Sequence, residues 1–245
     1  MLYLVGLGLD LKDISVGALE NVKKCSKIYL ESYTNVFPYS ITDLEKIIGK
    51  KLIIAKRKDV EENPDFIKEA KTKKVALLVS GDPLTATTHV DLLLRAKKAG
   101  VKVKIHHAPS ILTAIAETGL QLYKFGKTGS IAAWTGNFRP ESFYNLIKRN
   151  DEMKAHTLLL VDIGLPGHEG LYYIKSIAKI RYDNEMIEDR EFIVCEKLGT
   201  DDQKITIGKL KPMLKKRFSE PVCIIIPSEL HFVEKEFLDL IKKEN

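Results

Sequence analysis

VALLVSGDPLTATTH, residues 75–89, decides the fold of the first half of this chain. Its apolar beginning, rich in valine and leucine, is typical of a strand that is buried on both faces. The strand ends at Gly81-Asp82-Pro83, and small hydroxylated residues follow before a helical pattern begins. Ligands bind at the carboxyl ends of strands in open parallel sheets, because helix N-termini and free backbone groups converge there. The stretch therefore predicts a parallel sheet with a binding site at this turn.

Strand-like and helix-like segments alternate around this stretch throughout residues 2–107. Short apolar runs typical of strands lie at 2–7, 27–31, 51–55 and 101–107. Helical patterns lie near 15–26, where Ser15 is a good N-cap, and near 40–49, 64–72 and 88–99. Strands that alternate with helices and are apolar on both faces indicate a parallel α/β sheet.

The pattern changes after Pro109 and Ser110, where SILTAIAETGL predicts a short apolar helix capped by Ser110. Strands are predicted at 130–135, 156–163, 191–198, 203–210 and 222–227, and helices at 140–149, 169–180 and 233–243. Some of these strands follow one another without a helix, which indicates antiparallel pairing and hence a mixed sheet. We expect two α/β domains, 1–108 with a mostly parallel sheet and 109–245 with a mixed sheet, and a site in the cleft between them.

The composition argues against several kinds of partner. The 245 residues carry 39 Lys and Arg against 33 Asp and Glu, a net charge of +6. The lysines are scattered in short mixed runs, and no run interleaves arginine with aromatic residues as a nucleic-acid-binding surface would. No apolar segment approaches the roughly 20 residues of a membrane span. We expect no nucleic-acid partner and no membrane association, and a modest attraction to an acidic protein stays open.

The N-terminus and the cysteines indicate a cytoplasmic protein. The opening MLYLVGLGLD lacks a basic segment and has an aspartate too early for a signal peptide. Cys25, Cys195 and Cys223 are an odd number, widely spaced, and each lies beside apolar residues. This pattern is typical of reduced thiols rather than of a disulfide framework or a zinc site.

The glycine-rich opening does not fit a phosphate-binding loop. VGLGLD resembles a dinucleotide fingerprint, but Leu11 stands where the third glycine is needed, and no helix follows directly. No Gly-Lys-Ser/Thr element occurs, which excludes a P-loop. His106 and His107 are adjacent in a predicted strand and so face opposite sides, where they cannot chelate one ion. We expect no metal site. Asp82 either binds a cation, hydroxyl or amino group of a ligand or fixes an Asx-Pro turn, and both readings stay open.

Several motifs taken together resemble the diphthine synthase family, which consists of methyltransferases of the tetrapyrrole-methylase-like class. They are MLYLVGLGL, VSGDPLTATTH, APSILTAI, GLQLYKFGKTGSI, NFRPESFY, HTLLLVDI and GTDDQKI, and they run from residue 1 nearly to the end of the chain. The resemblance implies two α/β domains, S-adenosylmethionine bound between them, and a homodimer. It also implies the substrate, a histidine of translation elongation factor 2 that carries an aminocarboxypropyl group. The amino group of the aminocarboxypropyl group would be methylated successively, which converts the modified histidine to diphthine in diphthamide biosynthesis. The short termini and compact loops resemble those of archaeal members.

The same resemblance implies which residues bind the cofactor: Leu9, Asp82, Thr85, Ser110 and Ile111 from the first domain, and Val161, Leu198 and Cys223 from the second. It implies no dedicated catalytic residue, because the enzyme mainly aligns an amine with a methyl group on a good leaving group. His89 or Asp162 are candidates to relay a proton.

Two alternatives remain. One is a methylase of the same class that acts on a corrin precursor, although such enzymes favour a longer glycine-rich opening than VGLGLDLKD. The other is a non-catalytic protein that binds nucleic acid, which would need a contiguous basic face.

Overall fold

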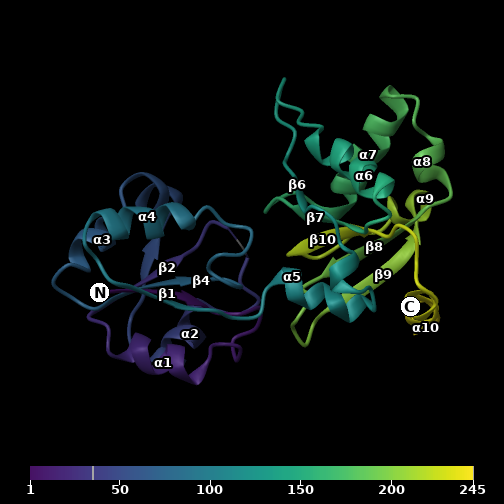
Figure 1. Cartoon of the computed structure of the whole chain (residues 1–245). Coiled ribbons are helices and arrows are strands. Elements are labelled where there is room, and N and C mark those ends of the chain that lie inside the picture. The colour runs from purple at the N-terminus through teal and green to yellow at the C-terminus, as the bar shows by residue number, and fades with distance from the viewer. Residues whose placement is uncertain (35, 245) are drawn as a thin grey trace. The chain divides into compact units, whose positions relative to one another are not determined.

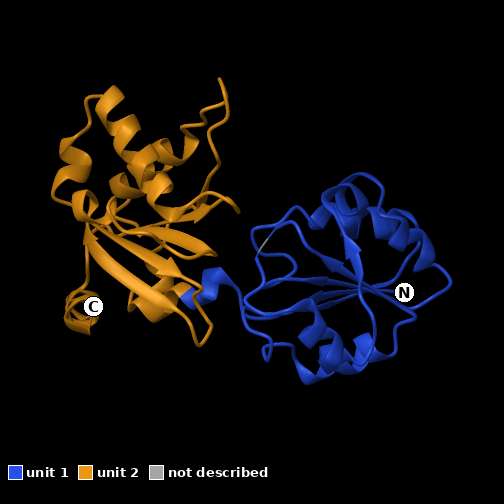
Figure 2. Cartoon of the chain, turned by 180° about the vertical axis from the view of Figure 1, so that it is seen from behind, with its two compact units in different colours: residues 1–114 blue, residues 115–245 orange. Residues whose placement is uncertain are grey.

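A computed structural model describes residues 1–34 and 36–244 of the chain. The chain divides into two compact units, Met1–Ala114 and Ile115–Asn245 (Figure 2). Each unit is built on its own five-stranded sheet. The expectation of two α/β units, one with a parallel sheet and one with a mixed sheet, is confirmed.

The sheet of unit 1 is wholly parallel, and its strand order is β3-β2-β4-β1-β5 (Figure 1). Leu2 of the interior strand β1 is in register with Val75 of β4 on one side and with Val103 of β5 on the other. The strands are β1 (Leu2–Gly6), β2 (Lys27–Glu31), β3 (Ile53–Ala55), β4 (Val75–Val79) and β5 (Val103–His106).

Helices cover both faces of this sheet, because successive strand side chains point to opposite sides. Leu2 and Leu4 belong to the core beneath α3 (Asp65–Glu69) and α4 (Val90–Lys98), whereas Tyr3 and Val5 belong to the core beneath α1 (Val16–Lys23) and α2 (Ile41–Ile48) (Figure 1). Burying each leucine contributes about 1.5–3 kcal/mol. The N-cap predicted for α1 is present, since the Ser15 hydroxyl accepts from the backbone N–H of Ala18.

The path of the chain distinguishes one edge of this sheet, the edge formed by the carboxyl ends of its strands. Strands β1 and β4 are neighbours, but the helix that follows β1 lies on one face and the helix that follows β4 lies on the other. Neighbouring strands whose connections leave in opposite directions form a topological switch point, where open α/β sheets bind their ligands. The two loops that start there are residues 7–15 and residues 80–89.

The sheet of unit 2 is mixed, with the order β6-β7-β10-β8-β9. Strands β6 and β7 pair in parallel, and the other pairs are antiparallel, as the sequence predicts for the second half. The strands are β6 (Gly129–Ile131), β7 (Thr157–Val161), β8 (Glu191–Glu196), β9 (Lys204–Lys209) and β10 (Val222–Ile226).

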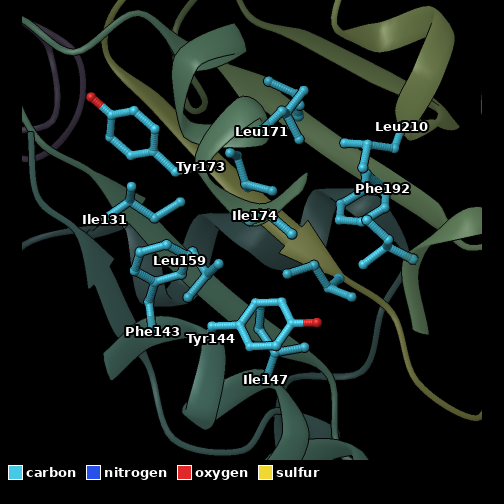
Figure 3. Close-up of a cluster of buried hydrophobic side chains, with 14 of the residues drawn as sticks. Ile131, Phe143, Tyr144, Ile147, Leu159, Leu171, Tyr173, Ile174, Phe192 and Leu210 are labelled. Carbon is cyan, nitrogen blue, oxygen red and sulfur yellow. The ribbon is translucent and has the colours of Figure 1, made fainter. Parts of the chain in front are cut away.

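The core of unit 2 fills the space between one face of this sheet and two helices, α6 (Ser142–Glu152) and α7 (Gly167–Ile180). Phe143 and Tyr144 of α6 and Ile174 of α7 lie over Leu159 (Figure 3). A Cβ at Gly170 of α7 would lie 3.2 Å from Ile224 Cδ1, so the missing side chain lets the helix approach the sheet closely. The remaining elements are η1 (Lys58–Glu62, one turn of π-helix), α5 (Ile111–Ala114), η2 (Ile115–Thr118), η3 (Leu122–Lys124), α8 (Glu185–Glu188), α9 (Leu210–Met213) and α10 (Phe232–Glu244).

Candidate active site

Two glycines join the loops that leave β1 and β4. The backbone N–H of Gly8 donates to the Gly81 carbonyl at 3.2 Å, and the N–H of Gly81 donates to the Gly8 carbonyl at 2.8 Å. Both residues have positive φ, +76° and +67°, in the region that favours glycine. The pair extends the contact between the strands past their ends and turns both loops away from the sheet.

Gly6 shows how closely three segments approach at this edge. A Cβ on Gly6 would lie 2.6 Å from the Gly81 carbonyl oxygen and 2.9 Å from both Pro83 Cδ and Ala108 Cβ. These atoms belong to the chain after β4 and the chain after β5. Only a residue without a side chain fits there, so the carboxyl ends of β1, β4 and β5 converge on one place.

The loop after β1 is fixed by Asp13, which the sequence did not single out. Asp13 Oδ2 accepts from the backbone N–H groups of Leu9 at 2.8 Å and Asp10 at 2.9 Å. Leu9 is one of the residues predicted to bind the cofactor, and its N–H is therefore already satisfied. Its half-buried side chain and its carbonyl are the parts left to meet a ligand.

Asp82 fixes the turn after β4 through both of its oxygens. Oδ1 accepts from the backbone N–H of Leu84 at 2.9 Å and from the Thr85 hydroxyl at 3.3 Å. Oδ2 accepts from His107 Nδ1 at 2.7 Å and from the backbone N–H of Ala108 at 3.3 Å. The predicted Asx turn at Asp82 is present. The same carboxylate also binds residues of the chain after β5.

The carboxylate of Asp82 is buried and ionised. Burial by itself favours the protonated form, but the hydrogen bonds from Leu84, His107 and Ala108 outweigh it, so the pKa of Asp82 lies below its ordinary value. An ionised carboxylate accepts at about four positions, and Leu84, Thr85, His107 and Ala108 occupy four of them. A ligand group would therefore bind Asp82 in place of one of the longer bonds, from Thr85 or Ala108 at 3.3 Å, and the ligand-binding role of Asp82 stays a prediction.

The other unit 1 residues predicted to bind the cofactor lie around the same turn. Thr85 donates to Asp82, and the next residue, Ala86, has φ +55°, a strained conformation for a residue other than glycine. Ser110 is buried, and its Cα lies 3.9 Å from the place where a Gly81 Cβ would stand. Ile111 begins α5 directly after it. Unit 1 therefore brings its five predicted residues to one edge of its sheet.

The three predicted residues of unit 2 lie at one edge of the second sheet. Val161 ends β7, and Leu198 follows β8 immediately after Lys197, which has φ +46°. Cys223 lies on β10 between these strands, opposite Leu160 and Cys195. It is 2% exposed and its strand is paired on both sides, so its thiol is packed in the sheet. The assignment of all three to the cofactor stays a prediction.

Both candidates for proton relay, His89 and Asp162, make polar contacts within the chain. Both ring nitrogens of His89 face a protein acceptor, the Pro83 carbonyl and the Glu31 carboxylate, and the ring is 2% exposed. Asp162 is exposed, and its Oδ2 accepts from the backbone N–H of Ala133 at 3.4 Å. The role of either residue in proton relay stays a prediction.

Metal-binding clusters and membrane-spanning helices are both absent from the residues that the structure describes. No group of three or more His, Cys, Asp or Glu is placed to hold a metal ion in residues 1–34 and 36–244. Within the same ranges, no helix combines the length and the apolar character that crossing a bilayer requires. The site therefore offers glycine-lined backbone, one ionised carboxylate, hydroxyls and apolar side chains.

Known proteins similar to this chain show its family. Residues 1–213 match the family model described as Tetrapyrrole (Corrin/Porphyrin) Methylases. Diphthine synthase of Methanocaldococcus jannaschii is 44% identical over 97% of each chain, and human diphthine methyl ester synthase is 42% identical over 98% of this chain and 94% of its own. A crystal structure of diphthine synthase, 34% identical, superposes with a TM-score of 0.87 over 99% of this chain and 96% of that one. The chain is therefore a methyltransferase that belongs to the tetrapyrrole (corrin/porphyrin) methylase family, among the diphthine synthases.

Proposed function

We propose that this methyltransferase uses S-adenosylmethionine to methylate, in successive steps, the amino group of the aminocarboxypropyl-histidine of translation elongation factor 2, giving diphthine. The observation that carries the proposal is the glycine-lined edge at the ends of β1 and β4, which presents backbone and the buried carboxylate of Asp82 rather than a phosphate-binding loop. The names of the relatives supply the pathway, diphthamide biosynthesis.

The residues present fit this cofactor. A Cβ built on Gly81 would lie in ordinary contact, 3.9 Å, with Pro109 and Ser110, so the backbone of Gly81 is not crowded on that side. Asp82 is ionised, and a cofactor amino or hydroxyl group would replace one of its two 3.3 Å donors, Thr85 or Ala108. Leu9, Thr85, Ser110 and Ile111 would complete the unit 1 part of the site, and Val161, Leu198 and Cys223 would contribute from unit 2.

The bound cofactor would supply a methyl group on a sulfonium, which is a good leaving group. The chain has to hold the amine, the methyl carbon and the sulfur in line, and such orientation contributes up to about 7–11 kcal/mol. The attacking amine must be unprotonated, and an exposed amine is largely protonated at neutral pH. Exclusion of water by the apolar residues of the site would lower the pKa of that amine. No general base is required by this account, which agrees with the engaged nitrogens of His89.

The end point of the reaction separates two kinds of relative. One is named diphthine synthase and another diphthine methyl ester synthase, at 44% and 42% identity. We propose the trimethylated amine as the product. A corrin or porphyrin substrate, the alternative within the wider family, is not what the names of these full-length relatives indicate.

The partner and the setting follow from this substrate. An enzyme that modifies an elongation factor acts in the cytoplasm on a protein, and the net charge of +6 favours docking to an acidic surface. We also propose a homodimer, as the family resemblance implies.

Mass spectrometry of the product tests the proposal. The purified enzyme would be incubated with S-adenosylmethionine and elongation factor 2 that carries the aminocarboxypropyl group. We expect successive additions of one, two and three methyl groups on that histidine, stable to mild alkali. An additional methyl group that mild alkali removes would show the methyl ester instead. No methylation of this residue would contradict the proposed substrate.

A further inference from the structure

Glu31 and His89 form a buried pair at the same edge of the unit 1 sheet. Glu31 is the last residue of β2, the neighbour of β4, and its side chain is wholly buried. His89 follows the turn after β4 and is 2% exposed. Its Nε2 lies 3.1 Å from Glu31 Oε2, an ion-pair contact without the alignment of a good hydrogen bond. Neither oxygen of Glu31 has a hydrogen-bond partner among the described residues, so His89 is its closest compensating charge.

The partners of the two ring nitrogens assign the protons of His89. Nδ1 lies 2.9 Å from the carbonyl oxygen of Pro83, and a carbonyl only accepts, so Nδ1 carries a proton. Nε2 faces a carboxylate, which when ionised also only accepts, so Nε2 carries a proton as well. We therefore take the pair as an imidazolium beside a carboxylate, the assignment that the raised pKa of His89 supports.

A second buried histidine–glutamate pair shows the contrast. His156 Nε2 lies 3.2 Å from Glu234 Oε1, but its Nδ1 accepts from the backbone N–H of Ser228 at 3.0 Å. Nδ1 of His156 therefore carries no proton, and the ring is neutral. The directions of the two pKa values agree with this contrast. Burial lowers the pKa of His156 and prevails over Glu234, whereas for His89 burial is outweighed by Glu31, the Pro83 carbonyl and Glu61 together, so its pKa is raised.

The other charged groups around His89 lie on or next to η1 and α4. Glu61 lies on the π-helical turn η1, Asp91 and Arg95 lie on α4, and Arg95 pairs with Asp91 at 2.6 Å. The Tyr33 hydroxyl is buried without a hydrogen-bond partner among the described residues, beside Glu31 and Glu61, and its pKa is raised by burial and by these two carboxylates. Arg57 pairs with Glu61 at 3.4 Å and lies over the Tyr33 ring. Of these neighbours, Glu61 favours the protonated form of His89.

What His89 holds is the turn that contains Asp82. The Pro83 carbonyl accepts from His89 Nδ1 and, at 3.1 Å, from the Thr87 hydroxyl. Pro83 directly follows Asp82, whose side chain anchors the remainder of the turn. We propose that His89 is a positioning residue for the cofactor turn: its doubly protonated ring, held by Glu31, fixes the Pro83 carbonyl and with it the carboxylate of Asp82. This inference rests on the proposed function, because it assumes that the cofactor binds at this turn.

Two variants separate this role from simple packing. In His89→Asn the amide nitrogen takes the place of Nδ1 and keeps the bond to Pro83, whereas in His89→Gln the amide nitrogen reaches toward Glu31 and that bond is lost. Glutamine matches the volume of histidine better, so a packing role predicts that His89→Gln is the milder change. The positioning role predicts the opposite order for the affinity for S-adenosylmethionine. We expect His89→Gln to weaken binding about tenfold or more and His89→Asn to weaken it less.

A pocket beside His89 provides a rescue experiment. It has a volume of about 240 Å³ and is lined by His89, Glu61, Thr88, Leu92 and Arg95, among others. His89→Gly would extend this pocket into the place of the ring, and added imidazole is small enough to enter it. We expect imidazole to restore part of the affinity of this variant for S-adenosylmethionine. His156→Asn is the matched control, because it removes an equally buried ring at the end of β7 away from Val161, and it should leave the affinity unchanged.

The experiment combines calorimetric titration of wild type and these variants with nitrogen-15 NMR of the wild-type ring nitrogens, the His89 signals assigned from their loss in His89→Asn. Two protonated nitrogens on His89 at neutral pH and one on His156 are expected. A bare nitrogen on His89, or a variant order with His89→Gln the milder, overturns the positioning role while wild-type binding still supports the proposed function. Failure of the wild type to bind S-adenosylmethionine overturns both.

Discussion

Gly8 and Gly81 donate to each other's carbonyls, at 3.2 and 2.8 Å, and so fasten the loop after β1 to the loop after β4. The two loops start from neighbouring strands whose following helices lie on opposite faces of the sheet. This contact places backbone without side chains where a ligand is expected to bind. The proposed function therefore requires that the cofactor bind at this edge.

Gly8→Ala tests the hydrogen-bonded contact between the two loops. A Cβ on Gly8 would lie 2.0 Å from Asp13 Cβ, so Asp13 would have to move and release the N–H groups of Leu9 and Asp10. We expect this variant to lose measurable binding of S-adenosylmethionine. Gly100→Ala is the matched control, because Gly100 has nearly the same φ, +72° against +76°, and open space around it. The control should cost about 1–2 kcal/mol of stability from the backbone conformation alone and leave binding intact. Equal effects of the two variants on binding would contradict the role of Gly8.

Asp82→Asn tests the buried carboxylate. The substitution keeps the shape and removes the charge that Leu84, His107 and Ala108 stabilise, and we expect a loss of about 1.5–3 kcal/mol in the free energy of unfolding. Binding of S-adenosylmethionine should weaken as well. His107→Ala removes only the most exposed of these donors, a side chain 67% exposed, and should have a smaller effect on both quantities. Binding unchanged in Asp82→Asn, measured by calorimetry, would remove Asp82 from the site.

The pH dependence of stability in unit 1 has opposite signs at Asp82 and His89. The pKa of Asp82 is lowered in the folded chain, so its contribution is present above its unfolded value and is lost as pH falls through the folded one. The pKa of His89 is raised, so the contribution of the Glu31 pair is complete below the unfolded value of about 6.5 and is lost as pH rises through the folded one. Comparing wild type with His89→Asn in denaturant titrations should show a stability difference that shrinks toward alkaline pH. A difference that grows toward alkaline pH would contradict the charged pair.

In unit 2 the buried carboxylate of Glu234 has a stabilising role comparable to that of Asp82 in unit 1. It is wholly buried and accepts from Lys124, from the backbone N–H groups of Gln121 and His231, and from His156. Burial raises the pKa of Glu234, but these donors outweigh it and bring the value down to about 2. Because the folded value lies below the unfolded one, the contribution to stability is lost as pH falls toward about 2.

Glu234→Gln should therefore lower the unfolding temperature at neutral pH and reduce the acid sensitivity of unfolding. Glu229→Gln is the matched control, since Glu229 pairs with Lys154 on the surface, where both side chains are mostly exposed. Thermal unfolding followed by circular dichroism measures both variants. Equal unfolding temperatures of the two variants at neutral pH would contradict the structural role of Glu234.

The sequence predicts the framework of this site because the framework is local. The alternation of apolar runs with helical patterns predicts the parallel sheet, and Gly81-Asp82-Pro83 marks the end of β4. Ser15 caps its helix as expected, through atoms only three residues apart. Features of this kind depend on neighbours along the chain and on the period of the strand or helix.

What the sequence does not predict depends on which strands become neighbours. The sequence did not single out Glu31, which ends an apolar run; β2 lies beside β4, and that places Glu31 against His89. The sequence assigned no partner to His107, and the pairing of β5 with β1 brings it to Asp82. The segment KRKDVEE, typical of a solvated helix face, forms a π-helical turn that lines the pocket beside His89. Partners of this kind follow from the strand order, which no local pattern contains.

Calorimetric titration of the purified protein with S-adenosylmethionine, beside the Asp82→Asn variant, tests the central claim most directly. The account predicts saturable binding with one site per chain in the wild type and weaker binding in the variant, with no binding of ATP or of a nicotinamide dinucleotide to either. Absence of S-adenosylmethionine binding in a folded wild type would contradict the proposed cofactor and the function derived from it.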